Sequence, residues 1–205
     1  MINAFNRFLD TTTMYKVVMY SLSALVLEAL VFSLFKIIPY NIFSLLGSLV
    51  VILTSSLAVH FAFKKIYNAP ANIESTYISI FIAFFILAPV TNLEDGMWLV
   101  LASFIMVASK YVIAYANRHI FNPVAVGVFA VGLMGSLSAI WWIGSMYFLP
   151  CLVIITLLVI HKIKRYTLFF SYFAASIVTV TLLTLYRGDQ ISDALLQQVL
   201  SWPLL

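Results

Sequence analysis

The sequence predicts an all-α integral membrane protein: a polytopic bundle of about seven transmembrane helices followed by the start of an eighth. The first observation is composition, because the 205 residues are 64% hydrophobic and only 9% charged, whereas a soluble domain carries about 25% charged residues. The second is that long apolar runs recur along the chain, separated by short polar segments. The third is an aromatic content of 16%, which suits many helix ends at membrane interfaces.

Charge and cysteine content exclude several other classes. The net charge of +4 comes from short basic clusters between apolar runs, a pattern typical of membrane loops, and we expect no nucleic-acid partner. Cys151 is the single cysteine, so the chain has no internal disulfide and no CxxC motif for zinc or an iron–sulfur cluster. We expect no metal site.

The first two apolar runs predict full membrane crossings. Residues 1–16 form a polar N-terminus, and the span Val17–Ile38 follows and ends before Pro39. No small-residue cleavage site follows this run, so it is interpreted as an anchor and not as a signal peptide. The second span, Ile42–Phe63, ends at a pair of lysines.

The third apolar run is too short for an ordinary crossing. Tyr77–Ala88 contains about a dozen residues before Pro89, whereas a transmembrane helix needs about 20. An extension back to Ile73 would place Glu74 in the membrane, at a cost in free energy. We therefore expect this element to be short, broken or steeply tilted.

The remaining runs complete the predicted bundle. Asn122–Pro123 is a plausible helix start, since Asn accepts from free N–H groups and Pro has a preset φ. The chain ends in an apolar segment without a polar tail, which predicts that the natural protein continues into the rest of an eighth helix. The fourth to eighth runs are Met97–Ala116, Val124–Ile143, Met146–Ile160, Leu168–Tyr186 and Ile191–Leu205.

Lysine and arginine positions predict the orientation. With the N-terminus in the cytoplasm, the outer segments hold only Lys36 and Arg187. Such an excess on one side follows the positive-inside rule and predicts a multi-pass protein of the plasma (inner) membrane. The inner segments hold Arg7, Lys16, Lys64, Lys65, Arg118, Lys162, Lys164 and Arg165.

Three ionisable residues within the spans are candidates for function. Glu28 lies in the middle of the first span, where a charge costs about 2.5–3.5 kcal/mol; it is either an ion-coupling or proton site, or a protonated side chain bonded to a neighbouring helix. Lys110 lies in the fourth span and either extends toward the membrane surface or pairs with Glu28 or an anionic cofactor. His60, one turn before Lys64, is either an interfacial residue or part of a metal site or proton relay.

The start of the fifth span combines polar and small residues. The N-terminus of a short helix presents free N–H groups and a positive dipole end, which suit a phosphate or carboxylate. His119 and Asn122 precede the span, and Gly127 lies within it. The small residues of this span permit either close helix packing or the close approach of a planar ligand.

One motif is Lys110-Tyr111 followed by Arg118-His119-Ile120-Phe121-Asn122-Pro123-Val124-Ala125-Val126-Gly127. It resembles the "KY…R-HIFNPAAFG" signature of the NqrB/RnfD family, the membrane subunits of the sodium-pumping NADH:quinone reductase and of the Rnf electron-transport complex. Glu74-Ser75 with Ala88-Pro89, Trp141-Trp142-Ile143-Gly144-Ser145, Leu149-Pro150 and Lys162-Ile163-Lys164-Arg165 extend the similarity over roughly residues 70–205.

The resemblance implies a ten-helix, flavin-holding subunit built from two inverted five-helix repeats with broken helices. Residues 17–145 are then the first repeat, and residues 146–205 begin a second, incomplete one. An odd number of helices in the first repeat inverts the second automatically. The family attaches FMN to a Thr in a "D-x-(V/I)-S-G-A-T" motif, but Leu195 occupies that position here and has no hydroxyl to esterify. We therefore predict no covalent FMN.

Two classes of function remain after these inferences. The first is a membrane subunit of an ion-translocating, flavin-dependent electron-transfer complex that is not catalytic alone. It would bind FMN or riboflavin non-covalently through Lys110, His119, Asn122 and Gly127, couple an ion through Glu28, and act with other subunits or a fused domain. The second is a channel or transporter without a redox role, or a membrane anchor for a C-terminal reductase domain.

Overall fold

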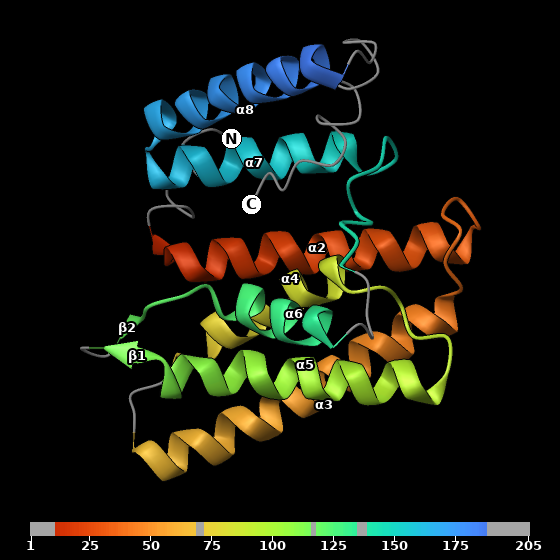
Figure 1. Cartoon of the computed structure of the whole chain (residues 1–205), viewed down its shortest axis with the longest axis vertical. Coiled ribbons are helices and arrows are strands. Elements are labelled where there is room, and N and C mark those ends of the chain that lie inside the picture. The colour runs from red at the N-terminus through yellow and green to blue at the C-terminus, as the bar shows by residue number, and fades with distance from the viewer. Residues whose placement is uncertain (1–10, 69–71, 116–117, 135–138, 188–205) are drawn as a thin grey trace. The chain divides into compact units, whose positions relative to one another are not determined.

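The computed structural model describes residues 11–68, 72–115, 118–134 and 139–187 (Figure 1). The regular elements of these residues are helices apart from one pair of two-residue strands, so the all-helical class is confirmed. In chain order the elements are α2 (Met14–Leu34), α3 (Ile42–Tyr67), α4 (Ile73–Ile86), α5 (Leu93–Val112), β1 (Ala114–Tyr115), β2 (Arg118–His119), α6 (Pro123–Leu133), α7 (Leu149–Ile163) and α8 (Tyr166–Arg187).

The chain divides into two compact units. One is Met19–Trp142, which holds most of α2 and all of α3 to α6; the other contains α7, α8 and the first residues of α2. The predicted last apolar segment, 191–205, and Leu195 within it lie outside the described residues. The inverted-repeat architecture stays a prediction.

Four of the described helices, α2, α3, α5 and α8, are long and apolar enough to cross a membrane. The other three are apolar but shorter, with 14 residues in α4, 11 in α6 and 15 in α7. A helix rises 1.5 Å per residue, so each of these covers roughly 16–23 Å of a hydrocarbon core about 30 Å thick. A membrane protein is therefore supported, while the number of crossings stays a prediction.

Asparagine begins every helix from α3 to α6. The side chains of Asn41, Asn72 and Asn122 each accept a hydrogen bond from the N–H two residues later, and Asn92 accepts from the N–H of Asp95 at 2.8 Å. An N-cap side chain satisfies one of the otherwise unpaired N–H groups of the first turn. The predicted start at Asn122–Pro123 is thus confirmed, and the other three caps follow the same chemistry.

The third predicted span begins earlier than its apolar run. α4 starts at Ile73 and contains Glu74 in its first turn. A carboxylate is favourable there, because the first turn carries the positive end of the helix dipole. The helix thus extends back to Ile73 with Glu74 at its end, and its 14 residues agree with the expectation of a short element.

The fifth predicted span is interrupted, because α6 ends at Leu133 and not at Ile143. Beyond it, Ala139 pairs with Leu87 as an antiparallel bridge, and the Ile140 N–H donates to the Ile86 carbonyl at 2.8 Å. The backbone N–H of Ile140, after α6, is therefore the hydrogen-bond partner of a backbone carbonyl at the end of α4. Irregular backbone within an apolar bundle is tolerated where it is paired in this way.

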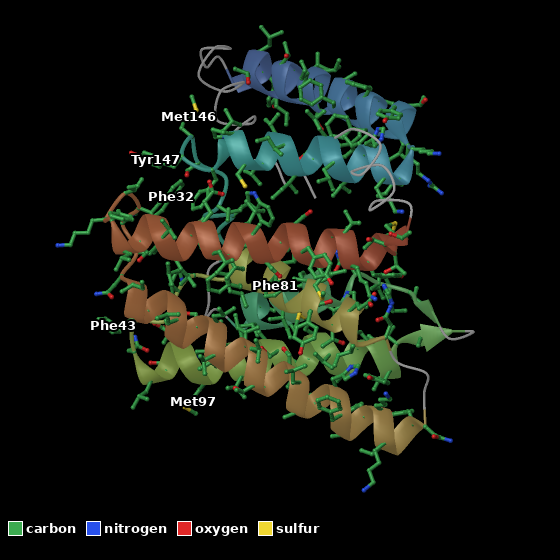
Figure 2. The ribbon with its side chains drawn as sticks, turned by 180° about the vertical axis from the view of Figure 1, so that it is seen from behind. Phe32, Phe43, Phe81, Met97, Met146 and Tyr147 are labelled. Carbon is green, nitrogen blue, oxygen red and sulfur yellow. The ribbon has the colours of Figure 1, made fainter. Side chains whose placement is uncertain are left out.

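The core of the Met19–Trp142 unit is built around α5. This helix packs most extensively against α3 and α6, and α3 also packs against α4. α3 and α5 run in the same direction: Figure 2 shows Phe43 and Met97, in their first turns, near the same end of the unit. At the other end α5 stops at Val112, and the β1–β2 hairpin turns the chain toward α6 (Figure 1).

The second unit contains the apolar helices α7 and α8. α7 has Pro150 in its first turn and ends at Lys164, whose φ of 57° lies in the left-handed region. α8 covers the predicted span Leu168–Tyr186 with two more residues at its start and one at its end. α7 and α8 contact each other along the unit.

Candidate functional site

A polar cluster lies inside the first unit, near the ends of α3 and α5 and the start of α4. Its centre is His60 of α3, whose side chain is 1% exposed. Nδ1 of the ring lies 2.9 Å from the Thr76 hydroxyl oxygen on α4 and 3.0 Å from the Tyr111 hydroxyl oxygen on α5. Three helices are thus joined through one imidazole nitrogen.

The Tyr111 hydroxyl also donates to the backbone carbonyl of His60, at 3.3 Å. A hydroxyl has one proton to donate and two lone pairs that accept. With its proton on the carbonyl, the Tyr111 oxygen is available to accept from Nδ1–H. This arrangement suits the tautomer in which Nδ1 carries the proton and Nε2 presents a lone pair. In the other tautomer the Thr76 hydroxyl donates to Nδ1, so the contacts fit both forms of the ring.

Lys110 extends the cluster toward the helix ends. Its Nζ donates to the backbone carbonyl of Ser75 at 2.8 Å and lies 3.4 Å from the Ser75 hydroxyl oxygen. Because α5 ends at Val112, Lys110 stands in the last turn of the helix, where a cation complements the dipole. It bonds to Ser75, and a pairing with Glu28 or an anionic cofactor stays a prediction.

We call the five residues His60, Ser75, Thr76, Lys110 and Tyr111 the His60 cluster. An aromatic layer lies against it: the Tyr111 ring is 5.7 Å from the ring of Phe63 and 6.1 Å from that of Tyr67. Such ring contacts add to the packing energy of the helix ends and hold the Tyr111 hydroxyl in place.

Three polar atoms of α3 and α5 are buried without a hydrogen-bond partner: Nε2 of His60 and the hydroxyl oxygens of Ser56 and Ser103. Serines in a helix usually donate to the carbonyl of the preceding turn. Five other serines of this unit do so: Ser23, Ser48, Ser55, Ser79 and Ser109. Ser56 and Ser103 therefore differ from their neighbours.

The sequence contained a signal for this site. Ser48, Ile52, Ser56 and His60 are spaced by four residues and form the buried stripe of α3. Residues four apart lie on the same helix face. Polar residues at this spacing in an apolar helix indicate a polar strip toward the bundle interior, and His60 was the only member that we singled out. Lys110 was also singled out, and Ser75 and Tyr111 belong to motifs of the family resemblance, whereas Thr76 had no such signal.

The other predicted cofactor residues form no hydrogen bond with the His60 cluster among the described residues. His119 is exposed in β2, where its backbone pairs with Ala114. Asn122 is exposed and caps α6 through Val124 N–H at 3.0 Å. No hydrogen bond or ring contact among the described residues joins these two to each other or to Lys110.

Gly127 is buried where α6 packs on α5. A Cβ atom at this position would lie 2.7 Å from the Ala102 carbonyl oxygen and 2.9 Å from Cβ of Met106. Of the two interpretations of this small residue, close helix packing is the one that these distances support. A flavin contact at Gly127 stays a prediction. Such a contact would have to lie on a face of α6 that α5 does not cover.

Glu28 is half-buried in α2, in the Met19–Trp142 unit, and its role in ion coupling stays a prediction. Within the described residues, no three His, Cys, Asp or Glu side chains are grouped so as to hold a metal ion. The chemistry that the His60 cluster itself offers is hydrogen bonding and proton exchange, because its members are one imidazole, three hydroxyl groups and one amine.

Comparisons of the chain with protein-family models, curated proteins and solved structures give no match.

Proposed function

We propose that this chain is a membrane subunit of an ion-translocating, flavin-dependent electron-transfer complex similar to the NqrB/RnfD family. It would not be catalytic alone. The bound flavin would supply the redox chemistry, while the protein would orient it and insulate it from water.

The observation that carries the proposal is that the residues of the family resemblance contact one another across elements. Lys110, of the Lys110-Tyr111 motif, donates to Ser75, of the Glu74-Ser75 motif, at 2.8 Å. The indole Nε1 of Trp142, of the Trp141-Trp142 motif, donates to the Phe84 carbonyl near the end of α4 at 2.9 Å. Motifs that meet in this way support a shared architecture better than isolated matches along the chain.

A flavin would be held non-covalently near the start of α6. Just before α6, His119 is exposed, and Asn122 caps the first turn of the helix. A helix N-terminus favours a phosphate or another anion. Of the cations in helices of the bundle, Lys110 is the nearest along the chain to the start of α6. A covalent link to FMN is not expected, because Leu195 has no hydroxyl group.

We place the protein in the plasma (inner) membrane with its N-terminus in the cytoplasm. The C-terminal ends of α3 and α5 lie at the same end of the unit, since His60 and Tyr111 are hydrogen-bonded. Lys64, Lys65 and Lys110 thus gather at one end, as the positive-inside rule requires. Lipid would cover the exposed apolar side chains, and other subunits or a fused domain would deliver electrons.

Cysteine labelling of intact cells tests this orientation. In a Cys151→Ser background, Ile120→Cys marks the hairpin end of α5 and Leu93→Cys marks the other end; both side chains are exposed. A membrane-impermeant maleimide should label the Leu93 variant and leave the Ile120 variant unlabelled until the cells are opened. The reverse pattern would refute the orientation.

The visible spectrum of the purified, detergent-solubilised protein tests the function. We expect flavin absorption that is released by acid precipitation, and no flavin fluorescence on a denaturing gel. His119→Ala should weaken flavin binding by about tenfold, the value of one hydrogen bond of about 1.4 kcal/mol. His161→Ala, an exposed histidine of α7 bonded to Tyr166, is the matched control and should bind flavin normally.

The alternative is a broken-helix channel or transporter without a redox role, or a membrane anchor for a C-terminal reductase domain. The buried polar strip of α3 and the interrupted helix α6 favour a solute pathway equally well. A colourless protein that conducts solute in liposomes would establish the first alternative and refute the flavin proposal.

A further inference from the structure

The three unpartnered polar atoms of Ser56, His60 and Ser103 require a hydrogen-bonding ligand. These residues are 0%, 1% and 2% exposed. A buried polar group without a partner destabilises the folded protein. Three such groups on the packed faces of α3 and α5 would be a large penalty, unless something inside the bundle bonds to them.

Ser56 and Ser103 both lie on the N-terminal side of the His60–Tyr111 contact on their helices. Ser56 precedes His60 by four residues, so the two side chains are neighbours on one face, with Cβ atoms about 5–6 Å apart. Helical side chains lean toward the N-terminus, which brings the imidazole over the turn that holds Ser56. Ser103 precedes Tyr111 by two turns on α5, which runs in the same direction and packs on α3.

The ligand that fits these groups is water. A hydrated sodium or calcium ion prefers several oxygen ligands, usually with a carboxylate, and the fully buried residues of the described chain include no Asp or Glu. Lys110 and Lys64 also place positive charge around the ring. Water can accept from both serine hydroxyls and donate to the Nε2 lone pair.

We propose that Ser56, His60 and Ser103 hold water inside the bundle, and that the His60 imidazole takes protons from this water and returns them. In the forward step a hydronium ion transfers its proton to the Nε2 lone pair; an N–H bond forms and neutral water remains. Nδ1–H stays bonded to Tyr111 or Thr76 throughout. The reverse step restores the neutral ring.

The surrounding charges limit how long the proton stays. Burial of the ring opposes an imidazolium, and so do Lys110 on α5 and Lys64 on α3. Of the other groups on these helices, Glu74 lies in the first turn of α4 and Tyr111 is neutral at physiological pH. A proton station must release as readily as it binds, and the two nearby amines promote release. This inference rests on the proposed function and deepens it, since it identifies the proton as an ion that the subunit handles.

Nitrogen-15 NMR of the histidine rings tests the proposal on the full chain in nanodiscs. The chain has three histidines, and the signals absent from His60→Gln identify His60. If that variant does not fold, Thr76→Val, which removes one partner of Nδ1, identifies the same signals by their shift. We expect the His60 nitrogens to titrate reversibly and Nε2 to exchange protons with water.

Serine variants supply the matched control. Replacing both Ser56 and Ser103 with Ala should slow exchange with water at Nε2 by roughly tenfold, the equivalent of one hydrogen bond of about 1.4 kcal/mol. Ser55→Ala, on the same helix but with its hydroxyl donated to Val51 at 2.6 Å, should leave exchange unchanged.

His60 signals that stay constant while His119 and His161 titrate would overturn the proposal and identify a core histidine of structural role. Equal exchange in the Ser55 variant and the double variant would overturn the part played by the serines. The visible spectrum of the same samples separates the two proposals: flavin with a static His60 refutes only the proton station, whereas a titrating His60 without flavin refutes only the electron-transfer function.

Discussion

Gly127→Ala is the sharpest test of how α6 packs on α5. The added Cβ would meet the Ala102 carbonyl oxygen at 2.7 Å, Cβ of Met106 at 2.9 Å and the Met106 backbone nitrogen at 3.2 Å. Two of these atoms belong to the backbone and the third is attached to it, so no flexible side chain can yield. The two helices must therefore separate by several tenths of an ångström.

The expected cost follows from that separation. Overpacking of a well-packed interior costs about 1–3 kcal/mol, and the better helix propensity of Ala returns only about 0.5–1 kcal/mol. We expect Gly127→Ala to lower the free energy of unfolding by about 1–2 kcal/mol. Gly132→Ala is the matched control, because a Cβ there would have no atom within 4 Å, and its stability should be unchanged or slightly raised.

Unfolding by a denaturing detergent, followed by circular dichroism of the purified full chain, measures both variants. Equal stability of the two variants would refute the packing argument. Normal stability of Gly127→Ala combined with loss of flavin would assign the glycine to the cofactor and not to helix packing.

Two further predictions use the same assay. Trp142→Phe removes the donor to the Phe84 carbonyl and should lower the free energy of unfolding by about 1–3 kcal/mol. The buried Nε1 of Trp141 has no hydrogen-bond partner, so Trp141→Phe should be neutral or stabilising. The opposite ranking would refute the role of the Trp142 bond. Asn122→Ala should cost about 0.5–2 kcal/mol through loss of the α6 cap, while Asn122→Asp keeps an acceptor and should retain most of the stability; equal losses would show that the cap contributes nothing.

The sequence by itself determined the class of the protein and most helix starts. Composition required a bundle of apolar helices, and the chemistry of an N-cap is local, since Asn122 bonds to an N–H only two residues away. The same local rule explains Asn41, Asn72 and Asn92, which our sequence analysis did not use. Glu74 lies in the first turn of α4, where the helix dipole favours a carboxylate, and the apolar run alone did not locate this start.

Tertiary structure alone decided where α4 and α6 end and where polar groups meet. The partner of the Ile86 carbonyl is Ile140, 54 residues along the chain, so nothing local to α6 announces its end. The partners of His60 lie 16 and 51 residues away, on two other helices. Periodicity predicts the helix face on which each side chain lies. Which faces contact each other depends on how the helices pack, and this packing brings Thr76 and Tyr111 to His60.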